Sequence, residues 1–210
     1  NDTKIIDERN DEFAPSFSIT VRDVETNEPI IANITIEGSK EMTALYSGSD
    51  IFLNVVRSGR IYIKCDAEGY FFVDKELELV ANSEQVVNLK MQRLKKGSSL
   101  QIEEIEFKPG TSEFMTGSEG KLNRLKDFMA SNAEINIEIQ GHVYAVGENS
   151  LGAQKLSEAR AKRVLIYLAD NGIDRNRMIA VGYGNTKPIY PNAKLAYEEQ
   201  ANRRVEIVVK

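Results

Sequence analysis

Leu156-Ser157-Glu158-Ala159-Arg160-Ala161 and Asn202-Arg203-Arg204-Val205-Glu206-Ile207 are the two stretches that decide the fold of the C-terminal half of this chain. Gly141-His142 precedes them, and Gly172-Ile173 and Gly182-Tyr183-Gly184 stand between them. One arginine falls within a helical pattern and another directly before a final alternating strand. Several short signals in this order are far more specific than any one of them alone.

Hydrophobic periodicity around these stretches predicts strands and helices in alternation. A capping box formed by Thr116 and Glu119 predicts the start of one helix. Asn171-Gly172, followed by Ile173, predicts that a second helix ends in a Schellman motif. The apolar residues that define the strands and helices are Ile102, Ile105, Phe107, Leu122, Leu125, Phe128, Met129, Ile135, Ile137, Ile139, Ala161, Val164, Leu165, Leu168, Ile179, Val181, Tyr183, Val205, Ile207 and Val209. This alternation is typical of an α/β sandwich with its helices against one sheet.

Upstream, residues 16–93 alternate with period two in short runs, which predicts an all-β sandwich. Phe17, Ile19 and Val21 form the first such run, and turn residues such as Asn27-Glu28-Pro29 separate the runs. Cys65 continues the alternation of Ile61 and Ile63, so we expect it to be a buried small hydrophobe.

The chain therefore divides into three parts. Residues 1–15 are polar and are expected to be a flexible lead-in. Residues 16–96 are expected to form the β-domain, and residues 97–210 the α/β domain. The basic, Gly- and Ser-containing junction that begins at Leu94-Lys95-Lys96-Gly97 marks the boundary.

Composition excludes several function classes. Residues 98–210 carry 15 basic and 15 acidic side chains, so the net charge of −5 comes from residues 1–97. Neither half has the basic surplus expected for nucleic-acid binding. One cysteine and one histidine, His142, leave no multi-ligand metal site of those residue types, and no catalytic triad can be identified. We therefore expect no cofactor, no metal and no enzymatic activity. No run approaches the roughly 20 apolar residues that span a bilayer.

The order of these C-terminal signals resembles the OmpA-like C-terminal domain, a two-layer α/β sandwich that binds peptidoglycan. The resemblance covers about half the chain. It implies that Arg160, in Leu-Ser-x-x-Arg-Ala, and Arg203, in Asn-Arg-Arg, bind a carboxylate of diaminopimelate in the wall stem peptide. It also places His142 and Asn202 at the site. His142 is expected to order the strand end and Asn202 to order a loop by hydrogen bonding.

Two positions depart from the family pattern. Tyr144 stands where the family has the aspartate that pairs with the ligand ammonium, and Ala153 stands where it has an asparagine. A neutral phenol cannot replace a carboxylate, although it can accept a hydrogen bond or stack. Glu148, in the same loop, is a candidate replacement anion.

Residues 24–30, 59–63 and 67–70 resemble a carboxypeptidase-regulatory-like, transthyretin-type β-sandwich. Together the two resemblances imply a non-catalytic envelope protein of the periplasm, associated with the outer membrane. It would bind peptidoglycan through one domain, while the β-domain spaces the chain or binds an envelope protein. The alternative is an OmpA-like interaction module that has lost diaminopimelate binding and is part of a type IX secretion or gliding assembly.

Overall fold

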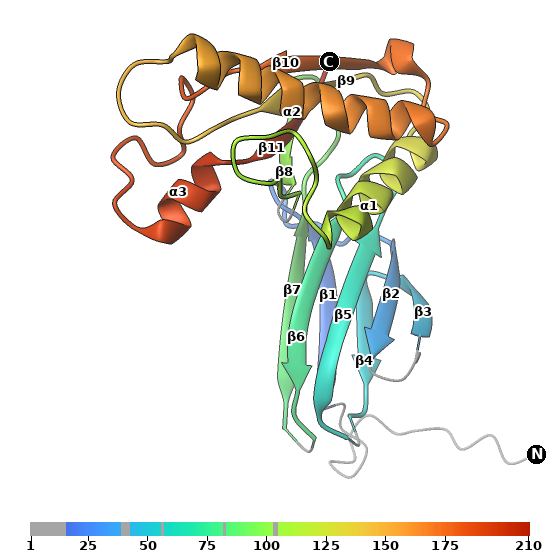
Figure 1. The fold of residues 1–210 in the computed structure, drawn as a ribbon. Helices are drawn as coiled ribbons and strands as arrows, with labels where there is room; N and C mark the ends of the chain where they lie inside the picture. The colour runs from blue at the N-terminus through green and yellow to red at the C-terminus, as the bar shows by residue number, and fades with distance from the viewer. Residues whose placement is uncertain (1–15, 39–42, 56, 82, 103–104) are drawn as a thin grey trace, which may run out of the picture. The chain divides into compact units, whose positions relative to one another are not determined.

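A computed structural model of the chain describes residues 16–38, 43–55, 57–81, 83–102 and 105–210. These residues form two compact units, one ending at Arg93 and the other beginning at Leu94 (Figure 1). The expected lead-in, residues 1–15, lies outside the described residues.

The N-terminal unit is β-rich, and its strands form two sheets. In one sheet β1 lies between β4 and β7, antiparallel to β4 and parallel to β7. The other sheet has the order β3-β2-β5-β6, with every pair antiparallel. The strands are β1 (Phe17–Asp23), β2 (Ala32–Gly38), β3 (Thr43–Gly48), β4 (Asp50–Leu53), β5 (Gly59–Asp66), β6 (Val73–Leu79) and β7 (Gln85–Met91).

Alternate side chains of both sheets enter one hydrophobic cluster. Ile19 of β1, Ile34 of β2 and Ile63 of β5 are fully buried in it. Cys65 is also fully buried there, as its place in the alternation predicts. The period-two pattern therefore selects the inward face of each strand, because successive side chains of a strand point to opposite faces.

A buried carboxylate holds the turn at the end of β1. Asp23 is 1% exposed, and it accepts hydrogen bonds from the backbone N–H groups of Glu25 (2.8 Å) and Thr26 (3.0 Å). It also accepts from Arg93 Nε at 2.7 Å and from the Tyr70 hydroxyl at 3.1 Å. The bond from the Thr26 backbone, followed by the bond from Arg93, holds the pKa of Asp23 well below its ordinary range.

We expect Asp23→Asn to lower the thermal unfolding midpoint at pH 7, because the neutral amide loses the ion pair with Arg93. A carboxyl with a depressed native pKa stabilises the fold above its ordinary pKa of about 3.9, and this contribution is lost as the pH falls below that value. The deficit should therefore be largest at neutral pH and shrink below about pH 4. Circular dichroism melts between pH 7 and pH 3 measure it (a matched control is Glu68→Gln, at an exposed turn residue). A deficit independent of pH would contradict this role of Asp23.

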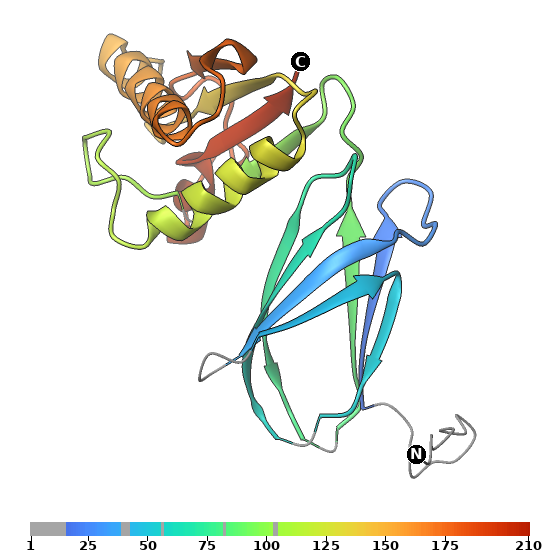
Figure 2. The same cartoon turned by 90° about the vertical axis from the view of Figure 1, so that its right-hand side faces the viewer.

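The C-terminal unit contains a four-stranded sheet with the order β10-β9-β11-β8, together with helices. β9 pairs with β10 in parallel and with β11 antiparallel, and α2 packs across β9 and β10 (Figure 2). Its elements are β8 (Ser99–Ile102), α1 (Ser118–Ser131), β9 (Ile137–Gly141), α2 (Leu151–Asp170), the 3₁₀ turn η2 (Arg175–Arg177), β10 (Met178–Gly182), α3 (Ala196–Asn202) and β11 (Val205–Val209). The prediction of an α/β domain here is confirmed.

The second helix ends as the sequence predicts. Gly172 has φ 94°, and its N–H donates to Ala169 O at 3.1 Å. Ile173 N–H donates to Leu168 O at 3.0 Å, and the Ile173 side chain is buried. These are the two hydrogen bonds of a Schellman motif.

The predicted start of the first helix is wrong. α1 begins at Ser118, after Gly117 at φ 102°, and no side chain caps it. Thr116 therefore lies outside the helix. The Ser118 hydroxyl instead accepts from Glu106 N and donates to Glu106 O, both at 3.0 Å. The helix start is thus held by a segment 12 residues away in sequence, a contact that local capping patterns do not report.

The expected first strand is shorter than predicted. β8 ends at Ile102, and Phe107 forms only an isolated bridge with Phe114. Ile105 is nevertheless buried. The helix α3 was not expected from the sequence.

No helix in the described ranges is long and apolar enough to cross a membrane.

Candidate ligand-binding site

The helix α2 lies close against the sheet at Ser157. Gly141 of β9 and Gly182 of β10 are partners in register and face this residue. A Cβ on Gly141 would lie 2.1 Å from the Ser157 carbonyl oxygen, and a Cβ on Gly182 would lie 2.4 Å from the Glu158 nitrogen. The fully buried Ser157 hydroxyl accepts from Gly184 N–H at 2.8 Å. This contact fixes the first half of α2 against the ends of two strands.

Arg160 stands one turn further along α2 and is 7% exposed. Its Nε donates to Thr111 O at 3.0 Å, and its guanidinium lies 4.9 Å from the centre of the Phe107 ring. Within the described ranges, no carboxylate lies within 4.0 Å of it. Burial, and secondarily the charge of Arg203, lower the pKa of Arg160. A buried cation beside a second cation is an arrangement that an anion would stabilise.

Arg203 reaches the same region from the end of α3. Its side chain is 38% exposed and lies 3.6 Å from the Glu199 carboxylate one turn earlier. It also donates to Gln200 Oε1 at 2.9 Å. Gln200 Nε2 donates in turn to Glu106 Oε1 at 3.0 Å, so an amide stands between the guanidinium and the carboxylate.

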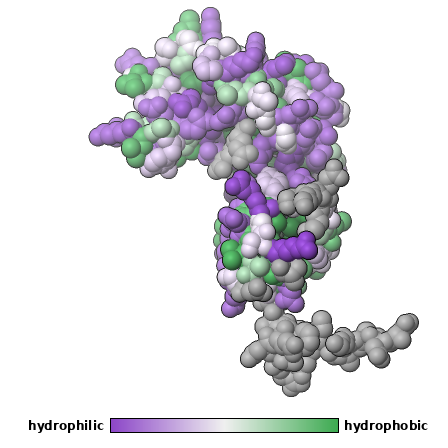
Figure 3. Space-filling view, turned by 60° about the horizontal axis from the view of Figure 1, so that its bottom comes forward, coloured by the Kyte–Doolittle hydropathy of each residue, from purple (hydrophilic) through white to green (hydrophobic). Residues whose placement is uncertain are grey.

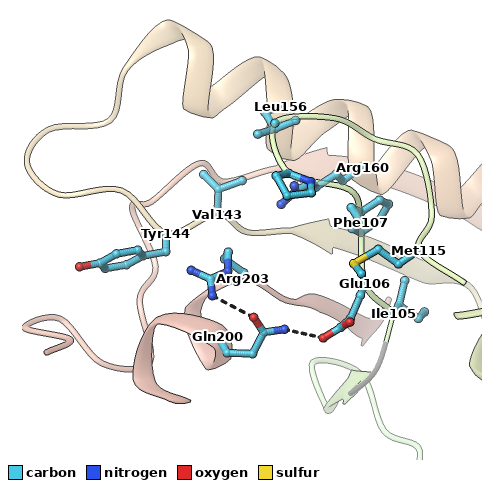
Figure 4. A pocket seen from close by; sticks show the side chains of 12 residues that line it. Ile105, Glu106, Phe107, Met115, Val143, Tyr144, Leu156, Arg160, Gln200 and Arg203 are labelled. Atoms are coloured by element: carbon cyan, nitrogen blue, oxygen red, sulfur yellow. Dashed lines mark hydrogen bonds between the residues drawn. The ribbon is translucent and has the colours of Figure 1, made fainter. Parts of the chain in front are cut away.

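The two arginines share a cavity of about 440 Å³. Figure 4 shows both guanidinium groups extending into the same space, Arg160 from α2 and Arg203 from α3. The cavity is lined by Ile105, Glu106, Phe107, Pro109, Gly110, Met115, Val143, Tyr144, Leu156, Arg160, Gln200 and Arg203. Its lining thus combines apolar side chains with two cations and one anion, which suits a small charged ligand.

Tyr144 lies at the edge of this cavity. Its ring points away from the arginines (Figure 4), and its hydroxyl is 3.5 Å from Ala193 O. Tyr144 also lines a neighbouring cavity of about 570 Å³, which includes Asn202. The candidate anion Glu148 is exposed and lines neither cavity.

His142 lies behind the site and does not line the arginine cavity. It is 2% exposed and stacks on Tyr183, with ring centres 5.6 Å apart. Burial, and then the charge of Arg204, lower the pKa of His142 to about 4 against the opposing effect of Glu206. The imidazole is therefore neutral near pH 7, and its 3.7 Å approach to the Glu206 carboxylate is not an ion pair there.

Asn202 is 2% exposed, and its amide is hydrogen-bonded to the preceding loop. Its Oδ1 accepts from Ile189 N at 2.7 Å and Tyr190 N at 3.0 Å, and its Nδ2 donates to Tyr190 O at 2.8 Å. These three hydrogen bonds connect Asn202 to the loop before α3. They set the chain direction directly before Arg203.

Sequence reasoning missed Glu106 and Gln200. Glu106 stands between buried Ile105 and half-buried Phe107, and this alternation could have indicated an outward carboxylate. Gln200 belongs to α3, which periodicity did not reveal.

Elsewhere on the C-terminal unit, the face in Figure 3 is largely hydrophilic, with hydrophobic side chains in separate spots.

Residues 106–203 match the model of the OmpA family. The chain is 38% identical over 106 residues to outer membrane porin F of Pseudomonas fluorescens, covering 50% of this chain and 32% of that protein. It is 28% identical over 133 residues to the peptidoglycan-associated lipoprotein of Buchnera aphidicola, covering 62% of this chain and 72% of that one. The predicted OmpA-like domain is confirmed at residues 106–203.

Two further similarities are partial. The chain is 38% identical over 113 residues to the photosystem I P700 chlorophyll a apoprotein A2 of Gloeobacter violaceus, covering 51% of this chain and 13% of that protein. The crystal structure of a putative MotB-like protein from Desulfovibrio vulgaris aligns with 31% identity and a TM-score of 0.47, covering 53% of this chain and 72% of that chain. The chain thus spans about a third or less of porin F and of the apoprotein.

We expect Gly182→Ala to destabilise the C-terminal unit by about 1–3 kcal/mol, the usual cost of overpacking. Its Cβ would meet the Glu158 nitrogen at 2.4 Å and the Ser157 hydroxyl at 2.6 Å, so α2 would have to move. Urea unfolding of both variants measures the change. The matched control is Gly120→Ala, at an exposed position of α1 with no atom within 4 Å, where a gain of up to about 1 kcal/mol is expected. Equal stabilities of the two variants would contradict the close approach.

Proposed function

We propose that the OmpA-like domain binds peptidoglycan through the stem peptide, with Arg160 and Arg203 holding a carboxylate of the ligand. The observation that carries this proposal is the buried guanidinium of Arg160, which has no carboxylate partner in the described residues and faces a second arginine across a cavity. Guanidinium groups form strong, charge-assisted hydrogen bonds with carboxylates. A ligand carboxylate would complete the charge balance of the cavity.

The other sequence-predicted site residues take supporting roles in this proposal. Tyr144 forms an edge of the cavity and contributes no charge. His142 and Asn202 hold the backbone on either side of the site, the first at the end of β9 and the second directly before Arg203. We therefore assign no direct ligand contact to these last two residues.

The names of two relatives support the proposal at the level of the domain. One is called a peptidoglycan-associated lipoprotein, and another is a peptidoglycan-binding protein, ArfA, of Mycobacterium tuberculosis, 35% identical over 88 residues and 26% covered by the match. We propose a non-catalytic role for this chain too, in the periplasm and associated with the outer membrane.

We expect Arg160→Ala to weaken binding to purified peptidoglycan sacculi by about tenfold to 100-fold, since hydrogen bonds to charged groups contribute about 1.5–3 kcal/mol. A co-sedimentation titration measures it, with thermal unfolding to verify that the variant is folded. Arg175→Ala is the matched control, because Arg175 is exposed on η2 and does not line the cavity. Unchanged binding by folded Arg160→Ala would rule out the assigned site.

A second candidate function is an interaction module that kept the fold and lost diaminopimelate binding. Two observations favour it: Tyr144 carries no charge and points away from the arginines, and Ala153 provides only a backbone N–H, which donates to Ser150 Oγ at 3.1 Å. Such a module would bind a protein of a type IX secretion or gliding assembly instead of the wall.

This candidate predicts that the wild-type chain shows no saturable binding to diaminopimelate peptides and that Tyr144→Asp gains it, because an aspartate restores an anion at the cavity edge. Isothermal titration calorimetry with a diaminopimelate tripeptide measures the gain. Tyr197→Asp is the control, at an exposed aromatic residue outside the arginine cavity. Binding by the wild-type chain that is as tight as that of Tyr144→Asp would reject this candidate.

For the N-terminal unit, we propose a carboxypeptidase-regulatory-like β-sandwich that spans residues 16–96 and acts as a spacer or binds an envelope protein. The two sheets with one shared core support the sandwich. The α/β domain would then span residues 97–210.

A further inference from the structure

The arginine cavity also contains an anion. Glu106 is exposed, lines the cavity, and comes from the segment between β8 and α1 rather than from the loop that follows β9. It is the one carboxylate among the cavity-lining residues. Figure 4 shows it on the opposite side of the space from Arg160. The cavity therefore presents two cations and one anion to a ligand.

Glu106 is kept apart from the arginines by an amide. Its Oε1 accepts from Gln200 Nε2 at 3.0 Å, and Gln200 Oε1 accepts from Arg203 at 2.9 Å. Within the described residues, Glu106 forms no ion pair, and no donor contacts its Oε2. The bridging amide thus positions the carboxylate without neutralising it, so its charge remains available to a ligand.

The other acidic side chains near the cavity either form ion pairs or do not line the cavity. Glu199 lies 3.6 Å from Arg203 on the same helix, and Glu158 is paired with Lys162 at 2.6 Å. Glu148 is exposed and lines neither this cavity nor its neighbour. Glu106 is therefore the group that faces the cavity with an unused carboxylate oxygen.

We propose that Glu106 is the ammonium-binding residue of this chain, so that the cavity recognises an amino-acid end group carrying an ammonium and a carboxylate close together. The carboxylate binds Arg160 and Arg203, and the ammonium binds Glu106. This inference rests on the proposed function, and it places the anion on a different element from Tyr144. It also explains how the cavity can select a zwitterion although the loop after β9 contributes no carboxylate to the cavity lining.

The test uses two peptides that differ in a single amine. One is the tripeptide L-alanyl-γ-D-glutamyl-meso-diaminopimelate, and the other ends in 2-aminopimelate, which keeps the distal carboxylate and lacks the distal amine. Affinities of the full chain are measured by calorimetry for wild type, Glu106→Gln, Arg160→Ala and the matched control Glu148→Gln. Glu106 is exposed and its backbone bonds with Ser118 do not involve the side chain, so Glu106→Gln should fold.

We expect Glu106→Gln to weaken binding of the diaminopimelate peptide by about tenfold to 100-fold, the range for a hydrogen bond to a charged group. Its binding of the aminopimelate peptide should equal that of wild type, and Glu148→Gln should match wild type with both peptides. Equal affinity of the wild type for the two peptides would overturn the inference, as would a loss in Glu148→Gln alone.

The same titrations separate the two proposals. Loss of both peptides in Arg160→Ala, with no effect of Glu106→Gln, would support the proposed function and reject the role of Glu106. No binding of either peptide by the wild-type chain would reject the proposed function and this inference together.

Discussion

The contact of the α2 backbone with Gly141 and Gly182 is the constraint on which the site depends. Any side chain at either glycine would overlap the backbone at Ser157 or Glu158, so the helix can only approach this closely where two neighbouring strands both carry glycine. The Ser157 hydroxyl then ties the helix to the turn after β10. Arg160 follows one turn later on the helix that this contact positions, and it is buried.

The rest of the cavity is built from elements far apart in sequence. Thr111 and Phe107 hold Arg160 from the segment before α1, while Arg203 arrives from α3. Gln200 connects Arg203 with Glu106 and keeps their charges from pairing directly. Of the three charged groups, only Arg160 is buried, so its charge is screened less by solvent than those of Arg203 and Glu106.

Two neutral side chains, His142 and Asn202, lie next to cavity-lining residues. His142 is neutral near pH 7 because it is buried beside Arg204, and it acts as a flat side chain stacked on Tyr183. Asn202 uses its amide on the loop before α3. His142 directly precedes Val143 and Asn202 directly precedes Arg203, and both Val143 and Arg203 line the cavity.

The expectation that Arg160 and Arg203 share a site came from the resemblance to the OmpA-like family. The sequence by itself determined the inward faces of the strands and the Schellman end of α2. These features depend on periodicity and on local backbone requirements, which residues close together in the sequence determine. Only the tertiary structure decided where α1 begins, that Tyr144 turns away from the arginines, and that Glu106 faces them. Each of these depends on contacts between segments distant in the chain, such as Ser118 with Glu106 and Gln200 with Glu106, and no local pattern encodes such contacts.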